Sequence, residues 1–215
     1  MFRHIRTTAA LICSASLATL AACATPSIDA RDGGEPGFFI TSANPGNGAN
    51  LGGLAGADAY CTTLAESAGL EARSWAAYLS SSEEDARDRI GDGPWYNVDG
   101  VLVAEDVEQL HDAGANALSK QASLSESGEV INGRGDEPNR HDILTGSAAD
   151  GTLSGTACDD WTSDGEGSAM VGHHDRTGGG DDPTSWNSAH GSRGCGLEDL
   201  RGTGGDGLFY CFASD

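Results

Sequence analysis

The sequence predicts an α+β domain with a small mixed sheet, short helices and long irregular loops, held together by two disulfides. Glycine accounts for 32 of the 215 residues and aromatic residues for only 6%, so turns are frequent and the core is small. Regular apolar patterns occur in the first half of the chain and at its end, with a long polar stretch between them. A domain with so modest a core commonly needs covalent cross-links, and the cysteines can supply them.

The N-terminus has the pattern of a secretory signal peptide. The first eight residues contain Arg3 and Arg6, and the apolar run AALICSASLATL follows within residues 1–22. This run is too short to span a bilayer. The segment LAAC that ends at Cys23 resembles the lipobox of bacterial lipoproteins. That resemblance implies that Cys23 is acylated, that residues 23–36 form a tether, and that the protein lies at the outer membrane or cell surface, because no Asp follows Cys23.

The predicted mature chain is strongly acidic. The whole sequence has 12 Lys and Arg residues against 33 Asp and Glu, and removal of the signal peptide with its two arginines leaves 10 against 33, a net charge of −23. Such a chain is repelled by nucleic acid and by anionic lipid. We therefore expect no nucleic-acid partner, and contact with the membrane only through the lipid anchor. A solvated acidic surface also keeps an exported protein soluble.

The cysteine count indicates two disulfides. Of six cysteines, Cys13 is lost with the signal peptide and Cys23 is the lipidation site. Four remain in the domain: Cys61, Cys158, Cys195 and Cys211. An even number in an exported chain favours disulfides, and three pairings are open. A cysteine metal site is disfavoured because no CxxC spacing occurs.

Regular elements are predicted mainly before residue 112. Apolar spacing, a capping box at Ser81 and Glu84, and turn residues give the following set: strands at 38–42, 75–80 and 207–212, helices at 54–69 and 81–90, a hairpin turning at Asp99-Gly100, and a short helix around Val107. Residues 125–206 are dominated by Gly, Ser, Asp, Asn and Thr with short apolar islands. They predict loops unusually long for a compact domain.

Several segments together resemble a known family. The first half contains FFITSANPGNGANLGGLAGADAYCTTLAESAGL, SWAAYLSSS and DARDRIGDGPWYNVDG, and the second half contains ILTGSAADGTLSGTACDDWTS and GCGLEDLRGTGGDGLFYCF. In this order they resemble bacterial surface proteins with a C-type-lectin-like fold, and they look like endostatin, a collagen-derived domain. The resemblance covers residues 37–213.

The resemblance implies a C-type-lectin-like domain over residues 37–215 and a definite disulfide pairing. The implied pairs are Cys61 with Cys211 and Cys158 with Cys195. The zinc site of endostatin lies at that protein's own N-terminus and has no counterpart here, so the resemblance does not imply zinc.

The segment GDEPNR suggests a calcium-dependent sugar site. Calcium-dependent C-type lectins place Glu-Pro-Asn between their first two cysteines and Trp-Asn-Asp between the next two, and this chain follows the same order. The resemblance implies Glu137, Asn139 and Asn187 as candidate calcium ligands, because calcium takes hard oxygen atoms. Trp186, which lies in a polar loop, is the candidate for stacking on a ligand, with packing in the core or loop as the alternative. Ser188 stands where the lectins have a ligand Asp, and both motifs lie farther from the following cysteine than in the lectins, so a loop without bound calcium is the favoured interpretation.

Two other clusters are interpreted as loop residues. Residues 134–136 spell Arg-Gly-Asp, which integrins can bind, but the triplet also arises by chance. Residues 173–175, His-His-Asp, lie near Asp181-Asp182 and His190. Because adjacent histidines point apart in a strand and no helical i, i+4 spacing links them, we expect a surface loop rather than a metal site.

The aromatic residues are expected mainly in the core. Trp75, Tyr78 and Trp95 lie in apolar segments, and Trp161 follows Cys158 as in the family pattern, which implies packing on a disulfide. No nucleophile elbow, phosphate loop or zincin motif occurs, so the sequence does not predict an enzyme. It predicts a lipid-anchored envelope protein that recognises a glycan or protein ligand through the loops at 125–195. The alternative is a structural envelope protein without a small ligand.

Overall fold

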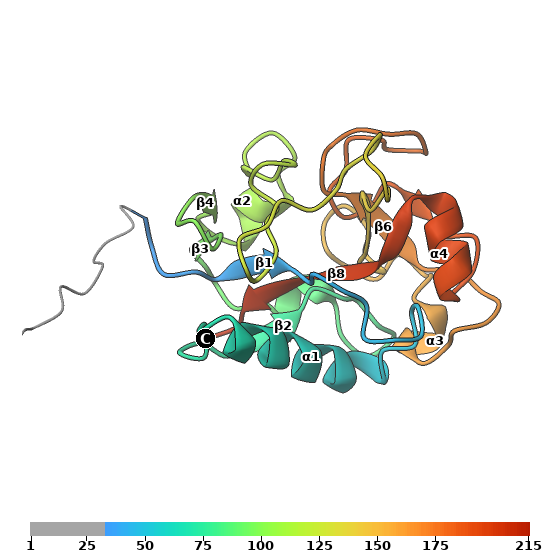
Figure 1. Ribbon diagram of the computed structural model, residues 1–215, viewed down its shortest axis with the longest axis horizontal. Coiled ribbons are helices and arrows are strands. Elements are labelled where there is room, and N and C mark those ends of the chain that lie inside the picture. The colour runs from blue at the N-terminus through green and yellow to red at the C-terminus, as the bar shows by residue number, and fades with distance from the viewer. Residues whose placement is uncertain (1–32) are drawn as a thin grey trace, which may run out of the picture. The chain divides into compact units, whose positions relative to one another are not determined.

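The last strand of the chain, β8 (Gly205–Ala213), lies at the centre of the fold, and all nine of its residues are buried. In the computed structural model, which describes residues 33–215, this strand runs through the middle of the molecule (Figure 1). The predicted signal peptide, Cys23 and most of the predicted tether lie outside the described residues.

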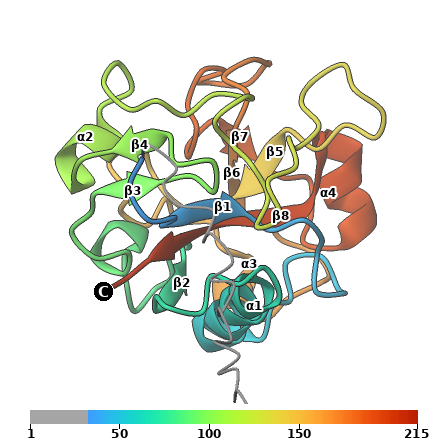
Figure 2. The same cartoon turned by 60° about the vertical axis from the view of Figure 1, so that its left-hand side comes forward.

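The main sheet has six strands in the order β1–β8–β5–β6–β7, with β2 paired to β8 outside this path. The strands joined to β8 in this way are β1 (Phe38–Ile40), β2 (Trp75–Ala77), β5 (Asp142–Leu144), β6 (Met170–His173) and β7 (His190–Gly191). β1 and β2 pair with the C-terminal half of β8, whereas β5 runs parallel to its N-terminal half. Figure 2 shows β5, β6 and β7 together beside the start of β8.

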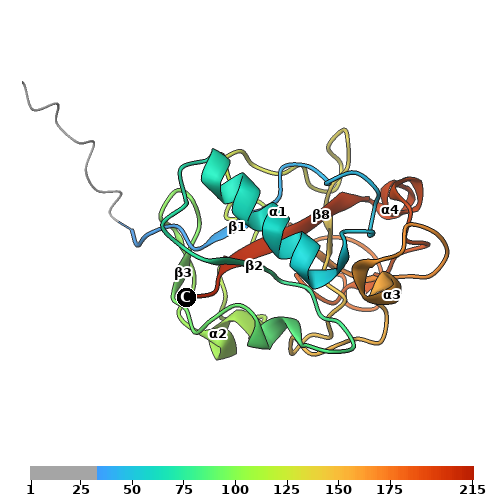
Figure 3. The same cartoon turned by 90° about the horizontal axis from the view of Figure 1, so that it is seen from below.

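Side chains of β8 alternate between two apolar cores, as the period of two along a strand requires. Phe209 and Cys211 belong to the core beneath α1 (Gly53–Ser67), and Tyr210 and Phe212 belong to the core on the other face. Figure 3 shows α1 crossing β2 and β8 on its side of the sheet. The second core is closed by these elements: β3 (Trp95–Tyr96), β4 (Leu102–Ala104) and α2 (Val107–His111).

Two disulfides connect distant parts of the chain, and their pairing is the one that the family resemblance implies. Cys61 on α1 bonds to Cys211 on β8, and Cys158 bonds to Cys195, each with a Cα–Cα distance of 5.7 Å. The bonded cysteines are 150 and 37 residues apart in sequence. Closing loops of these lengths in the unfolded chain stabilises the fold by about 5 and about 4 kcal/mol in the chain-entropy model.

The short helical turn α3 (Cys158–Trp161) is left-handed, because all four of its residues have positive φ angles between 47° and 67°. Left-handed helical backbone costs roughly 1–2 kcal/mol per non-glycine residue. Strong local contacts hold it: the inner disulfide, a hydrogen bond of 2.9 Å from the Trp161 indole to Ser80 O, and one of 2.8 Å from Ser82 N to the Asp160 carboxylate. Trp161 lies in the same core cluster as the inner disulfide.

Most elements predicted before residue 112 are confirmed, including the hairpin at Asp99-Gly100 and the burial of Trp75, Tyr78 and Trp95. The predicted helix at 81–90 is wrong, since only the 3-10 turn η1 (Ala86–Asp88) forms there. The hydroxyl groups of nearby serines accept hydrogen bonds from the backbone amides of this segment in place of helical carbonyls.

The second half of the chain contains more regular structure than its composition suggests. β5, β6, β7 and α4 (Leu197–Thr203) interrupt the predicted loops. The result is a mixed α/β domain with small sheets, short helices and two disulfides. None of the described helices has the length and apolar character needed to cross a bilayer.

Candidate metal centre

The ends of β5, β6 and β7 bring three histidines to one aspartate. Asp142, the first residue of β5, is the register partner of His173, the last residue of β6, and His190 on β7 is paired with Val171. Directly opposed residues, and residues two apart in one strand, project from the same face of a sheet. Asp142, His173 and His190 therefore share a face, and His141 joins them from the position just before β5.

The Nε2 atoms of the three histidines converge on one oxygen atom. From Oδ1 of Asp142, the distances are 3.0 Å to His141, 3.3 Å to His173 and 3.6 Å to His190. The rings of His141 and His173 stack with centroids 4.3 Å apart. Ligand atoms of His141, Asp142 and His173 all lie within 4.8 Å of one another, which is the spacing expected around a single metal ion with bonds of about 2.0–2.2 Å.

The other ring nitrogen of each histidine faces an acceptor. Nδ1 of His141 lies 3.4 Å from the Asp175 carboxylate, Nδ1 of His173 lies 2.9 Å from Pro183 O, and Nδ1 of His190 lies 3.1 Å from Gly191 O. These oxygens can only accept, so each Nδ1 donates its proton to them. A proton on Nε2 would face Asp142 in the metal-free cluster, and an Nε2 that gives up this proton offers a lone pair to a metal ion, the arrangement typical of metal-binding histidines.

The atoms at the centre of the cluster are buried and unsatisfied. Asp142 is 2% exposed and His173 is fully buried. Among residues 33–215, neither carboxylate oxygen of Asp142 nor Nε2 of His173 has a hydrogen-bond partner. An uncompensated buried carboxylate is strongly unfavourable, and a divalent cation between these atoms would satisfy the carboxylate and the imidazoles together.

Electrostatics keep both carboxylates of the centre ionised. Burial raises the pKa of Asp142, but the surrounding imidazoles of His173, His190 and His141 outweigh burial, and its pKa lies below the ordinary value. Burial likewise raises the pKa of Asp175, but contacts with His141 and with two backbone amides hold that pKa well below its usual range. An ionised Asp142 is available as a ligand, and an ionised Asp175 fixes the orientation of His141.

Two glycines make room for the cluster. A Cβ atom on Gly172 of β6 would lie 1.7 Å from Trp186 O, so only glycine lets the 174–189 loop fold back closely enough to return the chain at His190. Gly204 has a φ of +124°, and a Cβ there would lie 2.9 Å from His141 Nε2. The backbone thus leaves space beside the ring nitrogens that a larger residue would fill.

The ligand set selects the class of metal. Three imidazoles and one carboxylate suit zinc and other first-row transition ions, whereas calcium takes oxygen ligands almost exclusively. Zn²⁺, which is redox-inactive and is commonly bound by His and Asp, matches this ligand set.

The predicted calcium ligand Asn187 is wrong. Asn187 is buried, and its amide nitrogen donates to the Tyr78 hydroxyl at 3.0 Å and to Ala148 O at 3.1 Å. Its carbonyl oxygen accepts from the Ser185 hydroxyl at 3.1 Å. These bonds tie the side chain into the interior of the protein, where it cannot coordinate an ion bound at the surface.

The predicted role of Trp186 in stacking on a ligand is also wrong. Its side chain is 2% exposed and packs against Tyr78 and Tyr210, with ring centroids 4.7 and 5.3 Å away. Glu137 is exposed. Asn139 accepts a hydrogen bond from His141 N at 3.3 Å, which places it beside the histidine cluster rather than in a site with Asn187.

The interpretation of residues 173–175 as a surface loop is wrong as well. The two histidines do point apart, as a strand requires, but both are buried: His173 faces Asp142, and His174 lies 3.1 Å from Asn132 O through Nε2. In the Arg-Gly-Asp triplet, Asp136 accepts from Lys120 and from Gly133 N. Its carboxylate is therefore engaged within the chain.

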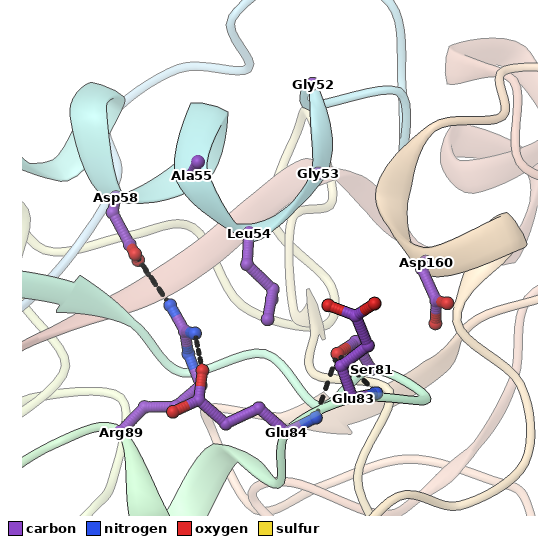
Figure 4. Close-up of a pocket in the computed structure, with 10 residues that line it drawn as sticks. All are labelled: Gly52, Gly53, Leu54, Ala55, Asp58, Ser81, Glu83, Glu84, Arg89 and Asp160. Carbon is purple, nitrogen blue, oxygen red and sulfur yellow. Dashed lines mark hydrogen bonds and ion pairs between the residues drawn. The ribbon is translucent and has the colours of Figure 1, made fainter.

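A cavity of about 520 Å³ lies away from the histidine cluster, between the start of α1 and the turn at residues 81–84 (Figure 4). Arg89 is the one cation in its lining, and it pairs with Asp58 at 2.7 Å and with Glu84 at 2.5 Å. Because this one cation is already paired with two carboxylates, the histidine cluster remains the better candidate site.

Sequence signals for the histidine cluster existed but were dispersed. His141-Asp142 precede a short apolar run, His173 follows another, and His190 lies in a polar stretch. Only the pairing of β5, β6 and β7 brings them together. Comparison with known proteins adds no family assignment: no protein-family model matches the chain, and no curated protein matches it.

Proposed function

We propose that the chain is a C-type-lectin-like binding domain whose recognition site is built on a transition-metal ion of the zinc class. His141, Asp142 and His173 are the inner ligands and His190 is the outer one. The observation that carries the proposal is the convergence of three Nε2 atoms on a buried carboxylate oxygen, with each Nδ1 committed to an acceptor. The lectin-like assignment is supported by the family resemblance and the shared disulfide pairing.

The proposal includes display outside the cytoplasm through acylated Cys23. The signal-like residues 1–22, the acidic composition and the two disulfides support this location, since disulfides persist in oxidising compartments. Incorporation of labelled fatty acid into the wild-type protein, and its loss in Cys23→Ser, tests the anchor.

Zinc binding is tested by measuring the zinc content and the melting temperature (Tm) of the purified protein. At free zinc about 100 times the Kd, binding to the folded state adds about 2.7 kcal/mol, which corresponds to a rise of roughly 5–10 °C in Tm for a domain of this size. Calcium at the same concentration should leave Tm unchanged, and a chelator should reverse the zinc effect.

Asp142→Asn is the sharpest variant, because it keeps the shape of the side chain and removes the central charge. We expect it to lose zinc, and circular dichroism of the metal-free variant and the metal-free wild type checks that both are folded. Glu137→Gln, an exposed acid in the predicted calcium motif, is the matched control and should retain zinc. The proposal is refuted by a wild-type protein that takes up no zinc, because the cluster would then be held by protons on the imidazoles.

A further inference from the structure

The histidine cluster opens on one side into a cavity of about 380 Å³. Besides the histidines, its lining consists of Arg134, Asn139, Gly179, Gly180, Gly191 and Thr203. The inner ligands have side chains that are at most 6% exposed, whereas the side chain of His190 is 22% exposed. An ion held by the buried residues would therefore have its outward side toward the cavity.

His190 is the least tightly placed ligand. Its Nε2 lies farthest from Asp142 Oδ1, at 3.6 Å, and the acceptor for its Nδ1 is the carbonyl of the adjacent Gly191. A zinc site with three firm ligands keeps a further position for an exogenous group. An ion bound by the three inner ligands would therefore keep a position open toward the cavity, beside His190.

The walls of this cavity favour an anion. Among residues 33–215, the guanidinium group of Arg134 makes no ion pair and no hydrogen bond, in a chain with a formal net charge of −21. A divalent ion bound to Asp142 would leave a charge of about +1, the ionised Asp175 behind His141 would offset it, and Arg134 adds a positive charge at the cavity wall itself. The remaining wall is largely glycine, which leaves space for a small group and presents no opposing acid.

We propose that the bound ion takes a small carboxylate from solution as its outward ligand, with one oxygen on the metal and Arg134 contacting the other. A guanidinium group matches a carboxylate in charge and in planar geometry. The inference rests on the proposed metal centre. Two sources share this chemistry, an acidic sugar and an N-acylated amino acid, and both are included in the test.

The experiment uses the protein loaded with Co²⁺, whose visible absorption spectrum reports the ligands of the ion. Acetate is titrated first, followed by glucuronate and N-acetylglycine, with glucose as the neutral probe. We expect the three carboxylates to change the cobalt spectrum saturably and glucose to leave it unchanged. Comparing glucuronate with N-acetylglycine shows which source binds more tightly.

Arg134→Gln should bind cobalt as the wild type does and bind acetate about tenfold more weakly, because a charge-assisted contact is lost. Arg87→Gln removes the same charge from a different cavity and should leave acetate binding unchanged.

The two hypotheses fail in different ways. A protein that binds neither cobalt nor zinc contradicts the metal centre itself. A protein that binds cobalt, but whose spectrum is insensitive to acetate, retains the metal centre and overturns the inference of an anionic ligand. Equal acetate affinity in the wild type and Arg134→Gln overturns the assigned role of Arg134.

Discussion

Asp142 and His173 are register partners across β5 and β6, and their facing atoms lie 3.3 Å apart without forming a hydrogen bond within the described part of the chain. A directly opposed pair of strand residues is among the most rigid placements that a sheet offers. The pair therefore holds two of the proposed metal ligands in position before an ion binds, which lowers the entropic cost of ordering them.

Loss of the buried His173 and loss of the partly exposed His190 should differ in their effect on zinc affinity. His173→Ala removes an inner ligand and should abolish zinc uptake at micromolar concentrations. His190→Ala removes the outermost ligand and should weaken zinc binding while leaving it measurable. Isothermal titration of the metal-free protein with zinc gives both affinities. Equal losses in the two variants would show that the ion sits midway between the histidines and not against β5 and β6.

Asp175 should affect the affinity for zinc although it does not coordinate the ion. Its carboxylate lies 3.4 Å from Nδ1 of His141 and accepts hydrogen bonds from Arg134 N at 2.6 Å and Thr177 N at 3.1 Å. Substitution of such an outer partner commonly costs 10–100-fold in metal affinity, so Asp175→Asn should fall in that range. Competition with a zinc-binding dye measures the change. Asp164→Asn, an exposed acid in another loop, is the control, and a similar loss there would point to a general effect of charge.

Trp186 should matter for stability. It packs between Tyr78 and Tyr210 in the second core, and the Tyr210 hydroxyl donates to Trp186 O at 2.8 Å. Trp186→Ala should reduce the free energy of unfolding by about 3–5 kcal/mol, and Trp186→Phe should cost clearly less because most of the volume is kept. Urea unfolding followed by circular dichroism measures both. A near-zero cost for the alanine variant would contradict the core assignment.

His111 should make stability depend on pH. Burial lowers the pKa of His111 by more than its hydrogen bond to Val107 O raises it. The neutral ring donates from Nδ1 to Val107 O and accepts at Nε2 from the Tyr78 hydroxyl, both at 2.7 Å. Because the folded pKa lies below the unfolded value of 6.5, this contribution to stability is complete above pH 6.5 and is lost as the pH falls below it.

The test compares the wild type with His111→Gln in urea unfolding from about pH 8 to pH 5. The wild type should lose stability below pH 6.5 more steeply than the variant. Arg87, Asp150, Glu108 and Asp112 line the cavity at His111 and the other histidines remain present, so only the difference between the two proteins reports on His111. Parallel curves would show that another group causes the pH dependence.

The elements that the sequence predicted well are those with strong local patterns. The helix carrying Cys61 and the strand GLFYCF have apolar spacing that decides their structure almost independently of context. β5, β6 and β7 have two to four residues each, too few to show a period, and they form because β8 and the inner disulfide hold them together.

The proposed metal centre was not predicted for a related reason. The neighbouring His173 and His174 do point apart, but the ligands of one metal ion need not come from neighbouring residues. The partners of His173 come from positions 141, 142 and 190, and their proximity follows from strand register, which a single sequence does not display. Conversely, the order of the Glu-Pro-Asn and Trp-Asn motifs matched the lectins, yet Trp186 and Asn187 are buried.

The antiparallel pairing of β1 with β8 places the entry of the chain into the domain and the histidine cluster at opposite ends of β8. Gly37, where the chain enters the domain, accepts a hydrogen bond from Ala213 N at 2.8 Å, whereas Asp142 is paired with Gly205 at the opposite end of β8. Eight residue steps along a strand span about 26 Å. A domain tethered to a membrane through the residues before Gly37 would therefore hold its histidine cluster at the end that lies away from the membrane.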